Sequence, residues 1–178
     1  MSLKEIDRFL TVAGVSIYHT DSKGIPEPFP IGIDEECTLP SISHPTMDVQ
    51  LMGSASIPNQ TALEDLECTF TLPNDPKSIA ALKSGVQGFI IRHAVNVSEA
   101  QTGNVALQGF TATVSGFVSS KEGLSLSAGG ESKTKVTVKC IYYRLADENN
   151  NELYCVDRPN GILKVGGTDY RARLRDLL

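Results

Sequence analysis

Apolar and polar residues alternate most regularly in the stretch from Val105 to Leu145. From Phe110 to Val118 every second residue is apolar or small, while Thr111, Thr113 and Ser115 lie between them. Such a period of two is typical of a β-strand that buries one face. This first run therefore predicts a long strand whose polar face carries those three residues.

A second run with the same period begins at Lys133. It predicts an apolar face and a lysine-rich polar face, formed by Val136, Val138, Cys140 and Tyr142 and by Lys133, Lys135, Thr137 and Lys139. Residues 121–131, which join the two runs, include Gly129 and Gly130 and are too many for a tight hairpin turn. We expect this segment to project from the body as an arm.

Shorter stretches complete the predicted set of strands. Alternation predicts strands over residues 8–18, 64–72, 89–97, 153–156 and 161–165, with a bulge or turn at Gly14 in the first. Met47, Val49 and Leu51 alternate weakly with polar residues, a pattern that indicates an apolar segment at a subunit contact. His93 lies on the apolar face of its strand, and we interpret it as a core residue.

Two helices are predicted from their end signals. Asp75 as N-cap, Pro76 at the first helical position and Gly85 past the end delimit a helix of about ten residues. A C-terminal helix is predicted over residues 168–178, with Tyr170 and Leu174 on one apolar face. Helices this short are stable only when they dock on another surface.

Composition narrows the range of functions. A chain of 178 residues is long enough for one domain, and its net charge of −5 argues against a surface that grips nucleic acid. No apolar run is long enough to span a bilayer and the N-terminus lacks a signal peptide, so we expect a protein that is made and kept in the cytoplasm.

The sequence offers no catalytic constellation and no metal site. The four cysteines form no CxxC pair, and the three histidines lack the spacing of metal ligands. We interpret the cysteines as buried reduced thiols. The residues Gly123-Leu-Ser-Leu-Ser127 lack the closing glycine of a nucleophile elbow. We therefore predict that the protein is not an enzyme and that it uses no cofactor.

Four segments resemble the major tail tube protein of contractile-tailed bacteriophages, the P2-like tube family that includes phage-tail-like bacteriocins. They lie in the same order as in that family along nearly the whole chain. The segments are Arg8-Phe-Leu-Thr-Val-Ala-Gly14; Cys37-Thr-Leu-Pro-Ser-Ile42 followed by Met52-Gly-Ser54; Lys133-Thr-Lys-Val-Thr-Val-Lys-Cys-Ile-Tyr-Tyr-Arg-Leu145; and Lys164-Val-Gly-Gly-Thr-Asp169 with its basic tail.

The resemblance implies a mainly β fold with one or two short helices, arranged as two packed antiparallel sheets or a partly open β-barrel with a flanking helix. It also implies six copies that close into a ring, and rings that stack into the tube through which DNA is ejected. The implied partners are other copies of the chain and the tail sheath, tape measure and baseplate proteins, with DNA passing unbound. The implied location is the virion tail, assembled in the bacterial cytoplasm.

Candidate contact and channel residues follow from the alternation pattern and from the family resemblance together. Subunit or ring contacts are predicted for Met47, Val49, Leu51, Met52, Leu124, Leu126, Gly129, Gly130, Tyr170 and Leu174. The channel is predicted to be lined by Thr111, Thr113 and Ser115, because a wall that bound phosphates would retain DNA. For the same reason we expect Lys133 and Lys135 to lie beyond the channel, paired with carboxylates of a neighbouring subunit.

Two alternatives stay open at this point. One is the tube protein of a type VI secretion system, which shares the fold but is not expected to carry the Thr-Leu-Pro and Lys-Val-Gly-Gly-Thr-Asp segments. The other is a small-ligand-binding β-barrel, which needs an enclosed apolar cavity and no self-assembly.

Overall fold

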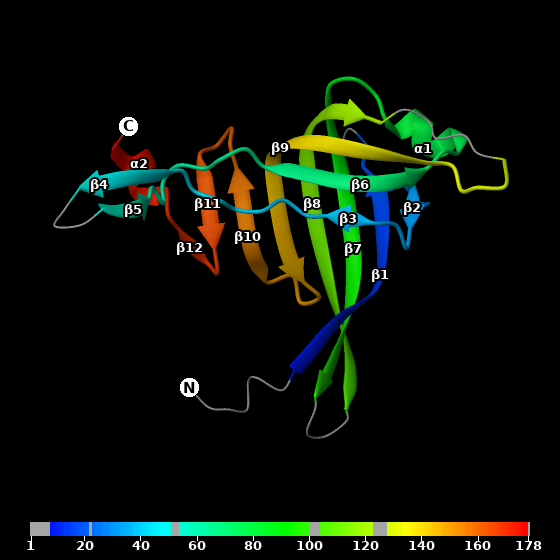
Figure 1. Cartoon of the computed structure of the whole chain (residues 1–178), viewed down its shortest axis with the longest axis horizontal. Coiled ribbons are helices and arrows are strands. Elements are labelled where there is room, and N and C mark those ends of the chain that lie inside the picture. The colour runs from blue at the N-terminus through cyan, green and yellow to red at the C-terminus, as the bar shows by residue number, and fades with distance from the viewer. Residues whose placement is uncertain (1–7, 22, 51–53, 100–103, 123–127, 178) are drawn as a thin grey trace.

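A strongly curved antiparallel sheet dominates the computed structural model, which describes residues 8–21, 23–50, 54–99, 104–122 and 128–177 (Figure 1). Its main path runs in the order β12-β11-β10-β9-β8-β7-β1-β2. The strands of the described residues are β1 Arg8–His19, β2 Gly32–Ile33, β3 Cys37–Thr38, β4 Thr46–Gln50, β5 Ser54–Pro58, β6 Glu67–Pro73, β7 Val86–Glu99, β8 Val105–Lys121, β9 Lys133–Asp147, β10 Glu152–Asp157, β11 Ile162–Val165 and β12 Thr168–Asp169. Two short helices, α1 Pro76–Ala81 and α2 Ala172–Leu177, complete the fold. The mainly β class predicted from the sequence is confirmed.

The sheet branches at β9. One edge of β9 pairs with β8, while the other edge pairs first with β6 over residues 133–139 and then with β10 over residues 142–146. Strand β6, with β3 at its side, therefore leaves the main sheet and folds across its front (Figure 1). Strand β2, at the far end of the sheet path, lies next to β6. The result is a partly open barrel.

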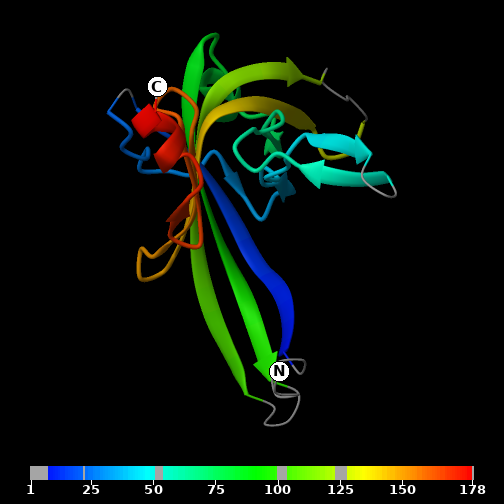
Figure 2. The same ribbon diagram turned by 90° about the vertical axis from the view of Figure 1, so that its left-hand side faces the viewer.

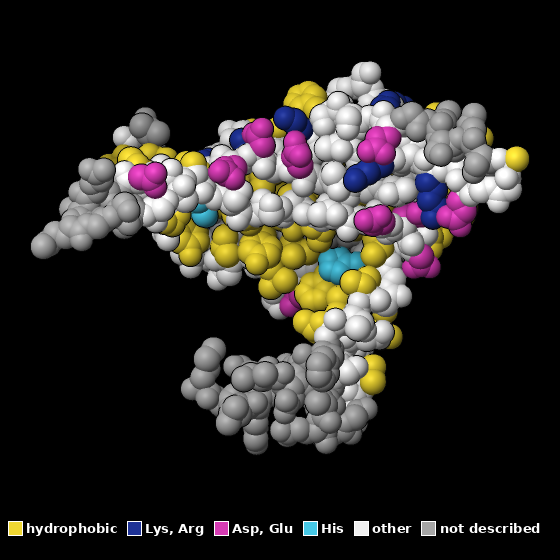
Figure 3. Space-filling model, in the orientation of Figure 1, with side chains coloured by type: hydrophobic (Ala, Val, Ile, Leu, Met, Phe, Trp, Pro, Cys, Tyr) yellow, Lys and Arg dark blue, Asp and Glu magenta, His cyan; other side chains and the backbone are white. Residues whose placement is uncertain are grey.

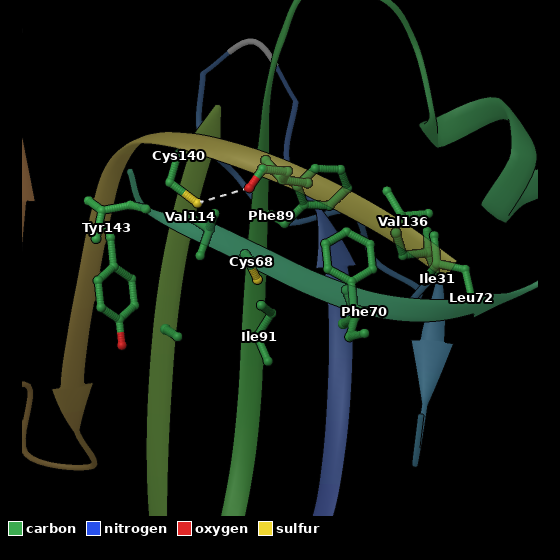
Figure 4. Packing of buried hydrophobic residues seen from close by; sticks show 14 of the residues in the cluster. Ile31, Cys68, Phe70, Leu72, Phe89, Ile91, Val114, Val136, Cys140 and Tyr143 are labelled. Carbon is green, nitrogen blue, oxygen red and sulfur yellow. Dashed lines mark hydrogen bonds between the residues drawn. The ribbon is translucent and has the colours of Figure 1, made fainter. Parts of the chain in front are cut away.

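The core fills the space between β6 and the main sheet. Phe70 of β6 meets Phe89 of β7 edge to face, with ring centroids 5.0 Å apart, and both side chains are fully buried (Figure 4). Val114 of β8, Val136 and Val138 of β9 pack around them. Each such side chain contributes about 1.5–3 kcal/mol through burial. Side chains thus occupy the interior that a ligand-binding barrel would keep open.

Helix α1 covers one end of this core. Asp75 accepts a hydrogen bond from the backbone N–H of Ser78 at 2.6 Å, and Pro76 starts the helix, as predicted. The Ser78 hydroxyl donates to the carbonyl of Ile31 at 2.7 Å, and Ala81 is buried. The helix has six residues and not about ten, and ends before Leu82, whose backbone leaves the helical region.

A bulge changes the predicted face of one tyrosine. The register between β8 and β9 shifts between Ser115 and Gly116, so that Ser115 pairs with Tyr142 and Gly116 pairs with Cys140. The extra residue reverses the alternation, and Tyr143 becomes the buried residue in place of Tyr142. The prediction of Tyr142 on the apolar face was therefore wrong. The predicted bulge at Gly14 is confirmed by a shift between Val12 and Gly14 of β1.

The C-terminal helix begins later than predicted. Thr168 and Asp169 form β12, which pairs with β11, and the helix occupies residues 172–177 instead of 168–178. Asp169 accepts a hydrogen bond from the backbone N–H of Arg171 at 3.0 Å, so this carboxylate, and not the Thr168 hydroxyl, supports the turn before α2.

Candidate assembly surfaces

The polar side of the main sheet carries the predicted channel residues. Thr111, Thr113 and Ser115 are half-buried and lie on the side of β8 opposite the buried Ala112 and Val114, which face β6. Directly opposite residues of antiparallel strands share a face, so this side also displays the partners Arg92, Arg144 and Tyr142 of the neighbouring strands. The three predicted residues thus lie together on one exterior face.

Three basic groups on this face, those of Arg144, Lys164 and Arg175, have acidic partners. Arg144 of β9 lies 3.1 Å from Glu152 of β10, and Lys164 of β11 lies 3.9 Å from the same carboxylate. Asp169 of β12 binds Arg175 of α2 at 2.6 Å. Hydrogen bonding to Arg175 lowers the pKa of the Asp169 carboxyl. The polar face is therefore charged. Arg144, Lys164 and Arg175 are matched by carboxylates of the same chain, whereas Arg92 lies over the ring of Tyr18, 5.2 Å from its centroid.

Lys133 also finds carboxylates within its own chain. Its ammonium lies 2.9 Å from Glu131 and 3.1 Å from Glu35, and these hydrogen bonds raise the pKa of Lys133. Lys139 lies 3.7 Å from Asp65. Lys133 therefore does not need the carboxylate of a neighbouring subunit that we expected for it. The side chain of Lys135 is exposed.

The β4–β5 hairpin carries part of the predicted contact set. Among the described strands, β4 and β5 pair only with each other, and they extend away from the main sheet (Figure 1). Met47 is 63 % exposed, and Ile57 on the opposite strand pairs with it and is 47 % exposed. Leu51, Met52 and the side chain of Val49 lie outside the described residues. The described part of the hairpin thus presents an exposed apolar pair.

The predicted arm at residues 121–131 is described only at its ends. Leu124 and Leu126 lie outside the described residues, whereas Gly129 and Gly130 are exposed. Gly129 has a φ of +80°, in the region that favours glycine.

An apolar groove lies beside the C-terminal helix. It has a volume of about 460 Å³ and lies among the segment before β4, the end of β5, strands β10 and β11, and Tyr170. We call it the terminal groove. Its lining comprises Pro40, Ser41, Ile42, His44, Pro58, Gln60, Tyr154, Val165 and Tyr170. Of the predicted contact residues, Tyr170 lines this groove and Leu174 is exposed on α2 nearby.

Sequence reasoning missed a further surface, a long extension of the sheet. Residues 8–15 of β1, 93–99 of β7 and 105–110 of β8 form a three-stranded ribbon that projects from the body (Figure 2). We call this ribbon the extension. Leu10 and Val12 are 67 % and 66 % exposed, and Val105 and Leu107 are exposed to a similar degree. The signal that could have revealed the extension is the lack of charged residues at positions 9–20, 93–98 and 100–120 of the sequence.

Leu10 and Val12, which pair with Val97 and Val95, lie on the face of the extension that continues the core face of the sheet, whereas Val105 and Leu107 lie on the opposite face. His93 stacks on Phe110 at the base of the extension, with ring centroids 5.2 Å apart, and burial lowers the pKa of this histidine. Figure 3 shows hydrophobic side chains gathered on the same side of the molecule, below the layer formed by β3 and β6. His93 is half-buried at the border of the core and not within it.

The cysteine thiols of the chain lie mainly in the core. Cys68, Cys140 and Cys155 are buried free thiols, as predicted, whereas Cys37 is a free thiol that is only half-buried. Burial raises the pKa of Cys140 to about 12, so its thiol stays protonated. In the described part of the chain, His, Cys, Asp and Glu form no group of three or more that could hold a metal ion. Neither described helix has the length and apolar character that crossing a membrane requires.

Chains in two cryo-EM structures are similar to this chain. No curated protein matches the sequence. A chain in the cryo-EM structure of an extracellular contractile injection system, the PVC sheath/tube terminator in the extended state, matches with 13 % identity and a TM-score of 0.46, covering 74 % of this chain and 91 % of that chain. A chain of the PVC sheath-tube complex in the extended state matches with 14 % identity and a TM-score of 0.46, covering 75 % of this chain and 88 % of that chain.

The family comparison covers most of the sequence. The profile described as "Phage tail tube protein FII" matches residues 30–178, which include every strand from β2 to β12 and both helices. This family is a structural component of phage tails, which confirms the prediction that the chain is not an enzyme. The chain therefore belongs to the phage tail tube protein FII family.

Proposed function

We propose that the protein assembles into hexameric rings that stack into the inner tube of a contractile phage tail, the conduit through which DNA is ejected. Membership of the tail tube family supports the structural role. The observation that carries the proposal of ring assembly is the open sheet. Among the described residues, β12 and the outer part of β1 each pair on one side only. Ring closure removes such free edges.

In this proposal the polar face of the main sheet lines the channel. Thr111, Thr113 and Ser115 are short neutral side chains. Of the cations on this face, Arg144 and Lys164 are matched by Glu152, and Arg92 lies over the ring of Tyr18. Such a wall gains little affinity for phosphate through counterion release, so DNA can pass along it. The tail sheath, tape measure and baseplate proteins are the other proposed partners. Assembly takes place in the bacterial cytoplasm before the tail is complete.

Electron microscopy of the purified protein over a range of concentrations tests the proposal. We expect rings of six copies and stacked tubes as the concentration rises. A strict monomer at every concentration would overturn it. A cryo-EM reconstruction of the tubes tests the channel assignment separately. Thr113 pointing toward the tube axis supports the assignment, and Thr113 buried between subunits or on the outer wall contradicts it.

A further inference from the structure

We propose that the extension of one copy is seated in the terminal groove of the next copy, so that neighbours in the assembly join head to tail. This inference rests on the proposed function, because it names the contact that would join the subunits. The groove is the one defined above by Pro40, Ile42, Tyr154, Val165, Tyr170 and their neighbours.

The first argument is the scarcity of charge in the extension, whose two charged residues, Arg8 and Glu99, pair with each other at its outer end. Residues 9–20, 93–98 and 100–120 contain no Asp, Glu, Lys or Arg, although 21 % of the whole chain is charged. A ribbon that projects into water needs charged side chains for solubility and to discourage wrong pairing. Leu10 and Val12 instead expose about two thirds of their surface. Such a ribbon is suited to burial against protein.

The second argument is that the terminal groove offers a matching lining. Its walls carry proline, isoleucine, valine and tyrosine side chains together with the neutral polar residues Ser41 and Gln60. His44 is the one acidic or basic residue in this lining. Tyr154 and Tyr170 are 37 % and 42 % exposed there. Tyrosine supplies a large apolar surface and a hydroxyl that can bond an exposed strand, and it is enriched in interface contacts. Residues 9–15, 93–98 and 105–110 of the extension carry no charge, so this part of the ribbon desolvates no ion of its own when it enters the groove.

The third argument is the position of the two surfaces on one sheet. A row of directly opposite residues crosses the sheet from Ile91 through Ala112 and Leu145 to Tyr154 and Val165. The groove therefore opens on the same side of the sheet as the core. Because side chains alternate along β7, Val95 and Val97 of the extension share the side of Ile91.

The two surfaces lie at opposite ends of the sheet path, which makes the contact heterologous. The extension continues β1, β7 and β8, whereas the groove adjoins β10, β11 and the β4–β5 hairpin (Figure 1). Because the strand order keeps the extension and the terminal groove of one copy apart, the extension can fill the groove of a neighbouring copy. A contact between two different patches of one chain generates rings or open filaments instead of closed dimers. This is the kind of contact that a tube subunit requires.

Cysteine cross-linking tests the inference in the full chain. The variant Leu10→Cys with Tyr170→Cys places one thiol on the extension and one in the groove, and a short bismaleimide joins thiols that lie close together. Leu10→Cys with Ile79→Cys is the matched control, because Ile79 is 52 % exposed on α1, away from the groove. The unsubstituted chain measures the background from its buried and half-buried native cysteines. Where Tyr170→Cys impairs assembly, Tyr154→Cys on the other wall replaces it.

A ladder of cross-linked multimers, from dimers up to the whole ring and specific to the extension–groove pair, is the expected result. Rings or tubes that show no ladder above the control pair would overturn the inference and leave the proposed function standing. Cross-linked dimers formed equally by Leu10→Cys alone would also overturn it, because they indicate extension-to-extension pairing. A monomer at all concentrations, with no cross-link, would overturn both.

Discussion

Replacing Gly116 with alanine places a methyl group inside the bulge between β8 and β9. A Cβ at this position would lie 2.0 Å from the carbonyl oxygen of Lys139 and 2.8 Å from the Cα of Cys140. Both are backbone atoms of the paired strand, so no side-chain rotation relieves the clash. To restore an ordinary separation of about 3.4 Å, the two strands would have to part locally by about 1.4 Å.

The expected cost follows from this displacement. Overpacking in a close-packed interior costs about 1–3 kcal/mol, and each weakened ladder hydrogen bond adds about 1 kcal/mol. We therefore expect Gly116→Ala to lower the free energy of unfolding by about 2–4 kcal/mol. For a chain of this length each kcal/mol lowers Tm by about 2–4 °C, so Tm should fall by about 4–16 °C.

Urea unfolding followed by far-ultraviolet circular dichroism measures this change at protein concentrations below those that give assembly. Gly109→Ala is the matched control on the same strand, because its Cβ would lie 3.9 Å from Glu148, an ordinary contact. Both changes reduce the freedom of the unfolded chain equally, so their difference isolates the clash. If Gly116→Ala unfolds at the same urea concentration as Gly109→Ala, the close approach of β8 and β9 is refuted.

Three further outcomes are expected. Asp75→Ala removes the N-cap of α1 and should cost about 1 kcal/mol in urea unfolding, whereas Asp75→Asn should retain most of it; equal losses would contradict the capping role. Hydrogen bonding to Ser78 lowers the pKa of Asp75, and hydrogen bonding to Arg175 lowers the pKa of Asp169. The two ionised carboxylates therefore contribute their full stabilisation above the ordinary pKa of 3.8, and this stabilisation is lost as the pH falls below 3.8. Unfolding curves at pH 7, 4 and 3 should show this loss, and a flat profile would count against it. Burial lowers the pKa of His93 from 6.5, so protonation should destabilise the fold as pH falls below about 6.5, and His93→Gln should flatten the Tm profile between pH 7 and 5; an unchanged slope would refute this.

The alternation of side chains predicted much of the sheet because it reports burial directly. Cys68, Phe70 and Leu72 face inward along β6, and Ala112 and Val114 do so along β8, as their spacing indicates. Asp75 and Pro76 marked the start of α1 because capping is a local interaction. These features depend on neighbours in the sequence.

Features that depend on pairing between strands could not be obtained in this way. The exchange of Tyr142 for Tyr143 at the core arises from a register shift that only the β8–β9 pair defines. The branch at β9 likewise depends on which strand meets each half of its edge. Among the candidate contact residues, Met47 and Tyr170 are exposed where a partner could reach them, and their role in assembly stays a prediction.

The branch at β9 also determines how the fold opens. Along its first half β9 bonds to β8 and β6, and along its second half it bonds to β8 and β10. Neither β6 nor β10 can detach without exposing backbone amide groups of β9, the strand that also supports the other of the two. Amide hydrogens of β9 should therefore exchange with solvent only in the rarest, global opening. The β4–β5 hairpin, which pairs with no other described strand, can exchange by local opening alone.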